Sequence, residues 1–190
     1  MSTAAAGDPQ PTRVTITHLE MTAPEQLRPK APGRPDLVVV RAIPPMPELN
    51  RFFYTAVGGD WYWLERLAWT YSDWLKYVDR PELETWLITA AGVPAGYFEL
   101  EAQPEANVEI AYFGLLPAFV GQSAGGWALS EAVRCGWAMG AKRVWVHTCD
   151  LDHPGALPNY LSRGFRVFKI ETKEELLPVR SPGPWPGART

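Results

Sequence analysis

VEIAYFGLLPAFVGQSAGG occupies residues 108–126 of this 190-residue chain and joins an apolar strand to a loop of small residues. A helical pattern follows from Gly121 to Gly140, and the apolar run at residues 143–149 is typical of a buried strand. A short helix at residues 154–163 and a strand at residues 165–170 complete the pattern. This order predicts an α/β fold in which the start of one helix offers free backbone N–H groups.

The rest of the chain adds strands and helices before this segment. Alternating and β-branched residues predict strands, and apolar residues at helical spacing predict helices. The predicted strands cover residues 13–19, 37–43, 84–91, 95–100 and 108–116, and the predicted helices begin at Pro47 and, after a Ser72 cap, at Asp73. Together these elements favour one mixed α/β (α+β) layer structure.

The chain is long enough for one domain with a full core and short for two. Residues 1–12 are small and polar, and we expect them to be disordered. We expect residues 13–172 to form the single domain. Residues 173–190 are Pro-rich and predict a loosely held C-terminal tail.

The composition excludes several classes of partner. With a formal net charge of −3 at pH 7, the chain has no general attraction to nucleic acid or to an anionic membrane. No apolar run approaches the roughly 20 residues that a membrane span needs. The N-terminus lacks the pattern of a secretory signal, and the two cysteines, Cys135 and Cys149, fit a reducing compartment. We therefore expect a cytoplasmic protein that binds neither nucleic acid nor membrane.

The small residues of GQSAGG, residues 121–126, are a candidate phosphate site. The first N–H groups of a helix have no partner within it, and the helix dipole adds partial positive charge there. Small residues let a phosphate approach this backbone closely. A close-packed turn without a ligand is the alternative. The segment matches neither the P-loop pattern nor GxGxxG, which argues against a dinucleotide-binding fold.

Three segments together resemble the GNAT superfamily of N-acyltransferases. Gln122-Ser123-Ala124-Gly125-Gly126-Trp127 is similar to the family pattern of Gln or Arg, two residues, Gly, one residue, then Gly or Ala, although Trp127 replaces the last small residue. The strand at residues 107–117 resembles the fourth strand of the family. Ala156, Tyr160 and Gly164-Phe165 match a closing segment that reads N-x-x-A-x-x-x-Tyr and then Gly-Phe, with Asp152 and His153 where the family has its Asn.

The resemblance implies a GNAT-like fold, with a central, mixed, mostly antiparallel, splayed sheet flanked by helices. It also implies an acyl-CoA cofactor, acetyl-CoA in the first place. The implied cofactor contacts are the backbone of Phe113, Gly114 and Leu115, the loop residues Gln122, Ser123, Ala124, Gly125, Gly126 and Trp127, and His153 as a donor to the pantetheine. Gly114 within a strand independently indicates a bulge or the close approach of another backbone.

Two residues are candidates for acid–base chemistry. Glu109 lies in an apolar strand, and the resemblance implies a general base near this position that commonly acts through water. The resemblance also makes Tyr160 the acid that protonates the departing coenzyme A, and a phenol of pKa about 10 is protonated at neutral pH. A solvated face for Glu109 and a core position for Tyr160 are the structural alternatives.

The segment WYWLERLAWTY, residues 61–71, is rich in aromatic side chains. The resemblance implies that this region forms the wall for the acceptor. We expect Trp61, Trp63, Trp69 and Tyr71 to contact the acceptor and to prefer an aromatic or cationic amine. Packing of the same rings against the sheet is the alternative.

The predicted function is transfer of an acetyl group from acetyl-CoA to a primary amine, by direct attack in a ternary complex. The acceptor would be a small molecule or a peptide, and the Trp-rich surface favours a homodimer. One alternative is a non-catalytic acyl-CoA-binding or sensor module on the same fold. Another is a metal-dependent hydrolase centred on residues 147–153, although we expect no metal site because a second ligand pair is absent from the sequence.

Overall fold

The structure is a computed structural model that describes residues 8–185 and residue 188. The strands of this part are β1 (Gln10–Met21), β2 (Leu37–Ala42), β3 (Leu83–Ala90), β4 (Val93–Gln103), β5 (Asn107–Leu115), β6 (Arg143–Cys149) and β7 (Arg166–Leu177). The helices are α1 (Pro47–Gly58), α2 (Tyr71–Val78), α3 (Ala124–Ala138) and α4 (Ala156–Ser162). Short 3₁₀ turns cover Pro24–Gln26, Pro104–Ala106 and Pro117–Phe119.

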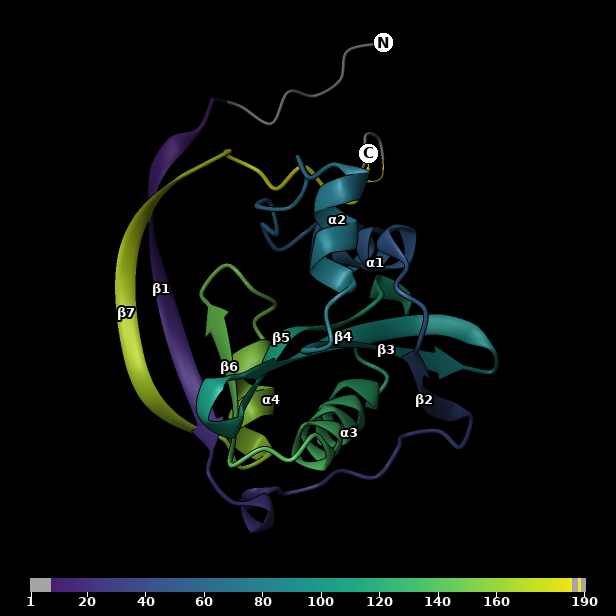
Figure 1. Ribbon diagram of the computed structural model, residues 1–190. Helices are drawn as coiled ribbons and strands as arrows, with labels where there is room; N and C mark the ends of the chain where they lie inside the picture. Colours follow the sequence, from purple (N-terminus) through teal and green to yellow (C-terminus); the bar gives the residue numbers. More distant parts are fainter. Residues whose placement is uncertain (1–7, 186–187, 189–190) are drawn as a thin grey trace.

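The strands form one sheet in the order β2-β3-β4-β5-β6-β1-β7 (Figure 1). Neighbouring strands are antiparallel except β5 and β6, which are parallel. The predicted mixed, mostly antiparallel sheet is therefore confirmed. The parallel pairing covers only Asn107–Glu109 with Arg143–Trp145, and beyond it the two strands separate. This separation splays the sheet between β5 and β6.

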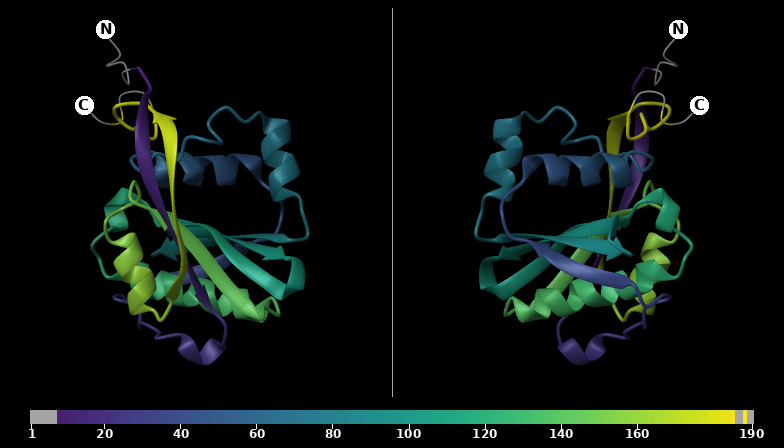
Figure 2. Two further views of the ribbon diagram at one scale, coloured as in Figure 1. Left: turned by 90° about the vertical axis from the view of Figure 1, so that its left-hand side faces the viewer. Right: turned by 90° about the vertical axis from the view of Figure 1, so that its right-hand side faces the viewer.

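Helices cover both faces of the sheet. Helices α1 and α2 lie over one face, and α3 and α4 lie over the other (Figures 1 and 2). Helix α3 buries Leu129 and Val133 completely in the larger core. Helix α1 packs Phe53 and Val57 with Tyr97 of β4 in a smaller core on the opposite face. The two cores hold β4 and β5 between them, which fixes the strand from which the site is built.

Strand β1 is an internal strand of the second half of the sheet. It pairs with β6 over residues 16–21 and with β7 over residues 10–20. Its Leu19 and Met21 side chains are fully buried. In Figure 2 the two strands β1 and β7 form a long ribbon whose far end stands beside the layer of α1 and α2. The start of the described chain therefore supplies part of the central framework.

The predicted domain limits differ from the structure at both ends. Strand β1 begins at Gln10, so residues 10–12 are paired and not disordered, while residues 1–7 lie outside the described residues. Strand β7 continues to Leu177, well past the predicted strand end and the predicted limit at residue 172. Its residues are almost all exposed because it is an edge strand, so no apolar periodicity marks it.

The segment after β7 is held more firmly than predicted. The Ser181 hydroxyl donates a hydrogen bond of 2.6 Å to the Gly59 carbonyl oxygen. The Tyr62 hydroxyl donates one of 3.3 Å to the Val179 carbonyl oxygen. These contacts attach residues 179–181 to the aromatic segment that follows α1.

Two predicted helix starts are wrong. Helix α2 begins at Tyr71 because the Thr70 side chain, and not Ser72, accepts the N–H of Asp73 in a capping box. Helix α3 begins at Ala124 and not at Gly121, because Gly121 and Ser123 both have positive φ angles that no α-helix contains.

Candidate active site at the opening of the sheet

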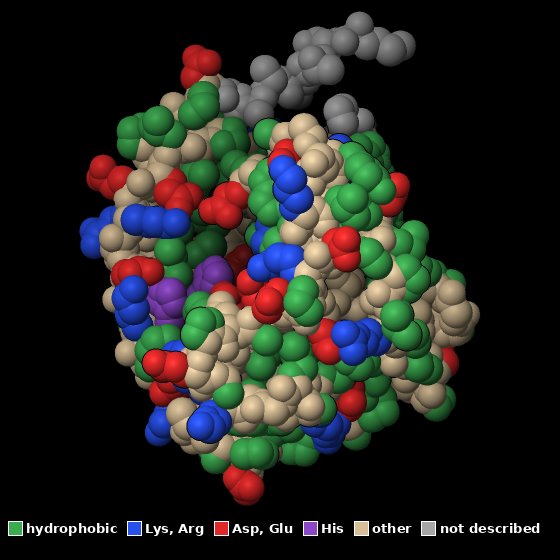
Figure 3. Space-filling view, in the orientation of Figure 1, with side chains coloured by type: hydrophobic (Ala, Val, Ile, Leu, Met, Phe, Trp, Pro, Cys, Tyr) green, Lys and Arg blue, Asp and Glu red, His purple; other side chains and the backbone are tan. Residues whose placement is uncertain are grey.

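A cavity of about 610 Å³ opens where β5 and β6 separate. Its walls come from β5, β6, the starts of α3 and α4, the aromatic segment after α1, and the ribbon of β1 and β7. Figure 3 shows a hollow in this region with histidine and acidic side chains at its rim. A cavity of this size accommodates a small-molecule ligand.

Strand β5 carries a bulge at the point where it leaves β6. Glu99 of β4 pairs with Tyr112, whereas the next residue, Leu100, pairs with Ile110. Ala111 is therefore an extra residue without a partner in the ladder. Such a bulge bends its strand, and here it lies two residues after Glu109, the last residue of β5 that pairs with β6.

Beyond the bulge, β5 presents backbone groups to the cavity. The Leu116 N–H donates to the Ala95 carbonyl oxygen at 2.8 Å, which places this residue's backbone groups on the β4 side. Because successive residues of a strand point their N–H and C=O groups to opposite sides, those of Phe113 and Leu115 face the opening. Both residues line the cavity, where the predicted cofactor contacts place them.

Gly114 is required by the packing of α1. A Cβ on Gly114 would lie 2.2 Å from Cγ1 of Val57, so no side chain fits. On β4, a Cβ on Gly96 would lie 2.3 Å from the Gly114 carbonyl oxygen. The predicted close approach at Gly114 is therefore present, and it involves a helix as well as a strand.

The start of α3 is open toward the cavity. Its N-cap residue, Ser123, has φ +61° and no side-chain hydrogen bond caps the helix. Gly125 and Gly126 line the cavity. A Cβ on Gly126 would lie 2.7 Å from Nη1 of Arg163 and 2.8 Å from Cδ of Lys30. Uncapped N–H groups, the Arg163 guanidinium and the Lys30 side chain thus lie at the start of α3, where phosphate oxygens find suitable donors.

Three residues of the predicted phosphate loop have other roles for their side chains. Gln122 donates to the Ala118 carbonyl oxygen at 2.6 Å and does not line the cavity. Ala124 and Trp127 are buried, and both belong to the larger core. Of the loop residues predicted to contact the cofactor, Gly125 and Gly126 line the cavity, whereas Gln122, Ser123, Ala124 and Trp127 do not.

Glu109 and His147 form a hydrogen-bonded pair beside the opening. Nδ1 of His147 lies 3.1 Å from Oε1 of Glu109. Gln103 donates to the other oxygen of Glu109 at 2.8 Å, and Trp145 donates to Gln103 at 3.0 Å. The Glu109 side chain is 12% exposed and does not line the cavity, whereas the His147 side chain is 47% exposed and does. His147 is therefore the member of the pair that a ligand meets.

The surroundings of His147 favour its charged form. The hydrogen bond to Glu109 is the main cause that raises the pKa of His147 above its ordinary value, and partial burial opposes it. The negative charges of Glu109, Asp152 and Glu65 act in the same direction as the hydrogen bond. With Nδ1 held by a carboxylate, Nε2 is the nitrogen left for proton exchange with a ligand.

Tyr160 of α4 lines the cavity next to Phe113, with ring centroids 6.4 Å apart. Burial, and after it the charge of Asp152, raises the pKa of the Tyr160 phenol far above its ordinary value. The phenol therefore keeps its proton at neutral pH. This is the protonation state that a general acid requires.

Two polar residues of the β6–α4 region complete the wall on this side. Nδ1 of His153 accepts the Gly155 N–H at 2.9 Å, which leaves Nε2 as a donor. The Asn159 side chain donates to the Gly125 carbonyl oxygen at 3.2 Å and joins α4 to the start of α3. Both His153 and Asn159 line the cavity, although only His153 was predicted to do so.

The aromatic segment divides into a cavity wall and an anchor. Trp61 and Trp63 line the cavity. The Trp63 ring lies flat on Gly58, where a Cβ would be 2.1 Å from it, and its N–H donates to Asp152 at 3.4 Å. The Trp61 ring packs edge-on against His153, with centroids 5.0 Å apart. These two indoles therefore supply the aromatic part of the cavity wall.

Trp69 and Tyr71 do not line the cavity. The Trp69 ring packs on the guanidinium of Arg66 at 4.7 Å and on Trp74 at 5.1 Å. Tyr71 begins α2 and is 60% exposed. The prediction that these two residues contact the acceptor is not supported by their position.

Arg66 anchors the aromatic segment to the sheet. Its guanidinium lies 3.5 Å from the fully buried carboxylate of Glu99, which also accepts hydrogen bonds from Asn50 and Tyr77. Five aromatic rings surround the guanidinium at 3.8 to 6.0 Å, namely those of Tyr54, Trp69, Trp74, Tyr77 and Tyr112. Tyr54 and Tyr112 also line the cavity, so the anchor stands directly behind its wall.

The residues of the predicted metal alternative have other partners. Burial raises the pKa of the Cys149 thiol to about 11, which keeps it protonated. Asp152 accepts the Thr148 hydroxyl at 2.7 Å and the Cys149 N–H at 3.0 Å. Across the described ranges, no group of three or more His, Cys, Asp or Glu is placed to hold a metal ion. The same residues contain no helix long and apolar enough to cross a membrane.

The fold and this cavity define a class of protein. Solved acetyltransferase structures have a similar fold. A GCN5-related N-acetyltransferase from Sphaerobacter thermophilus is similar with a TM-score of 0.63 and 20% identity, over 93% of this chain and 54% of that one. A second GCN5-related N-acetyltransferase, from Kribbella flavida, is similar with a TM-score of 0.59 and 19% identity, over 90% of this chain and 60% of that one. An aminoglycoside acetyltransferase from an uncultured soil metagenomic sample, solved in complex with trehalose, is similar with a TM-score of 0.56 and 12% identity. The similarity covers 67% of this chain and 87% of that one.

Residues 45–165 match the sequence profile of the acetyltransferase (GNAT) family, and the chain belongs to that family. The resemblance stated from the sequence is thereby confirmed. No curated protein matches the sequence. The chain spans little more than half of the first solved structure that it matches.

Proposed function

We propose that this protein transfers an acetyl group from acetyl-CoA to the primary amine of a small molecule or peptide. The observation that carries the proposal is that one cavity contains both the groups suited to an acyl-CoA and an acid–base pair. Gly125 and Gly126 of the helix start line the same space as His147 and Tyr160. Holding both reactants in one space supplies much of the rate acceleration, so no covalent enzyme intermediate is required.

The residues present fit an acyl-CoA. The uncapped first turn of α3, with Arg163 and Lys30 beside Gly126, would hold the pyrophosphate. The buried Nε of Arg163 has no hydrogen-bond partner within the described residues, which leaves a donor for such a group. Asn159 and His153 would hold the pantetheine arm. When bound, the thioester supplies the activated acyl group.

The chain's own groups then manage the protons and the charge. His147 accepts the proton of the acceptor ammonium through Nε2, and Glu109 stabilises the imidazolium that results. The Leu115 N–H stabilises the negative charge that develops on the carbonyl oxygen. Tyr160 donates its proton to the departing sulfur, and its phenolate then takes the second proton that the new amide nitrogen loses. Glu109, predicted as the base, acts in this scheme through His147.

Thermal unfolding with acetyl-CoA, free CoA, longer acyl-CoAs and malonyl-CoA tests the proposal. A ligand at 100 times its Kd stabilises a fold by about 2.7 kcal/mol, which is several degrees for a domain of this size. Release of free thiol in the presence of amines then measures transfer. We expect Tyr160→Phe to keep the thermal shift and to lose turnover. No shift with any CoA species would contradict the proposal, and a shift without thiol release would favour the non-catalytic module.

A further inference from the structure

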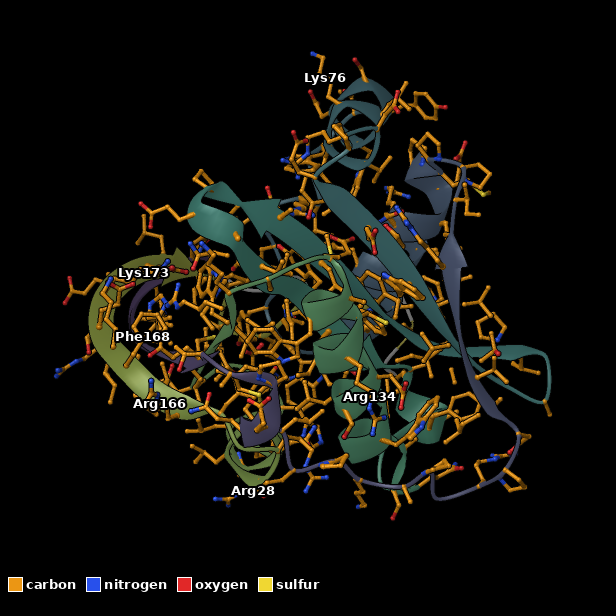
Figure 4. All side chains as sticks on the ribbon, turned by 60° about the horizontal axis from the view of Figure 1, so that its bottom comes forward. Arg28, Lys76, Arg134, Arg166, Phe168 and Lys173 are labelled. Carbon is orange, nitrogen blue, oxygen red and sulfur yellow. The ribbon has the colours of Figure 1, made fainter. Side chains whose placement is uncertain are left out.

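The acceptor side of the cavity carries carboxylates that the proposed reaction does not use. Glu65, Asp152 and Glu175 all line it. Glu175 forms an ion pair with Lys173, which lies on β7 (Figure 4). Among the described residues, Glu65 and Asp152 have no ion pair with a cationic side chain. Neither of these two carboxylates is therefore paired with a Lys or Arg, and both act on the cavity residue His147 through their charge.

Asp152 lies at the reacting end of the cavity. Its charge acts on Tyr160 and on His147, the two residues to which the proposed reaction assigns proton transfer. One of its oxygens accepts the Trp63 N–H, so the carboxylate lies at the edge of the aromatic wall. This position suits the ammonium group that is to react.

Glu65 lies in the middle of the aromatic segment. Its side chain is exposed, and its charge acts on Tyr54 and Tyr112 of the wall and on Lys173 across the opening. Because Lys173 forms its ion pair with Glu175, the negative charge of Glu65 is available to a bound cation. The rings of Trp63, Tyr54 and Tyr112, which line the same cavity, supply an apolar surface that also attracts cations.

We infer that the acceptor carries two positive charges: an alkyl diamine whose first ammonium group lies at Asp152 and reacts, while the second is bound by Glu65. The inference rests on the proposed function and names the substrate class of the same site. A monoamine with a neutral tail leaves Glu65 unpaired, and a tail with a carboxylate is repelled by it.

The test compares 1,4-diaminobutane with butylamine, which has the same carbon chain and one charge less. Isothermal titration calorimetry in the presence of CoA measures binding, and thiol release from acetyl-CoA measures kcat/KM. Glu65→Gln removes the second charge site. Glu174→Gln is the matched control, because Glu174 is an exposed acid of β7 that does not line the cavity.

We expect the wild type and the Glu174→Gln variant to bind the diamine at least about tenfold more tightly than butylamine, as a hydrogen bond to a charged group allows. Glu65→Gln should lose this preference while binding butylamine as before. Equal binding of the two amines by the wild type overturns the inference, as does tighter binding of phenethylamine than of the diamine. A diamine preference without thiol release instead overturns the proposed function and leaves the recognition of two charges standing.

Discussion

Among single residues, the pair of Glu109 and His147 decides how the site handles protons. Both oxygens of Glu109 are engaged by Gln103 and His147, so the carboxylate acts on the imidazole and not on the cavity. The pKa of His147 is raised above 6.5, so the charged imidazole contributes to the stability of the folded protein. This contribution is present in full below pH 6.5 and is lost as the pH rises through the raised pKa. Over the same interval the neutral imidazole, which accepts a proton, becomes the main form.

Replacing His147 with Gln removes the titrating group but keeps a side chain that hydrogen-bonds to Glu109. We expect kcat/KM to fall by about 10²- to 10⁴-fold. In the wild type, kcat/KM should rise with pH through a midpoint above 6.5, and this rise should be absent from His147→Gln. The measurement is kcat/KM for the acceptor amine as a function of pH, taken at amine concentrations below KM.

The positioning role of Glu109 has its own control in Glu109→Gln. This variant keeps the imidazole and removes the main cause of its raised pKa, while Asp152 and Glu65 still act on it. The midpoint of the rise should therefore move to lower pH. An unchanged rate and profile in His147→Gln would return the role of base to Glu109.

At the scale of elements, the start of α3 separates what local sequence predicts from what it does not. Gly125 and Gly126 were predicted because small residues at a helix start are a local signal. Arg163 reaches this place from the C-cap of α4 and Lys30 from the connector after β1, and no spacing in the sequence links them. Tertiary packing alone brings these cations together.

The same distinction explains the other differences within the site. His147 becomes a partner of Glu109 only because β5 and β6 pair in one particular parallel register. Trp63 turns into the cavity because Gly58 lets its ring lie flat, whereas Trp69 is drawn to a buried arginine. Aromatic composition predicted a wall but not its membership, since neighbouring tryptophans of one segment belong to different contacts.

Gly126→Val tests the phosphate site at the start of α3. The new side chain would occupy the space next to Arg163, Lys30 and Asn159, so it should block a phosphate and displace the cations. We expect the thermal shift with acetyl-CoA to disappear. The KM for acetyl-CoA should rise at least about tenfold, because this is the effect of losing one charge-assisted hydrogen bond. Ala138→Val, on the exposed end of the same helix, is the control for a β-branched residue in α3. Retained acetyl-CoA binding by Gly126→Val would move the phosphate elsewhere.

For the whole molecule, the position of β1 links the two ends of the chain. This strand lies between β6 and β7 and carries Val14 and Ile16 into the wall of the cavity. The sheet would have no continuous second half without it. The N-terminal segment therefore supports the site as well as the fold.

Leu19→Ala measures this contribution. Leu19 is fully buried, and we expect the change to lower the free energy of unfolding by about 2–5 kcal/mol. Leu176→Ala, in the adjacent strand β7 and 71% exposed, is the matched control and should cost no more than about 0.5 kcal/mol. Urea denaturation followed by circular dichroism gives both values. Equal small losses would show that β1 adds little to the core.

The place of β1 in the sheet also has a consequence for synthesis on the ribosome. The Thr15 N–H hydrogen-bonds to Asp150, 135 residues further along, so β1 emerges long before the strands that flank it. At 5–20 residues per second this interval is roughly 7–27 s. During that time the apolar residues Val14, Leu19 and Met21 have no sheet to join, which makes this segment the one that a nascent-chain chaperone should cover.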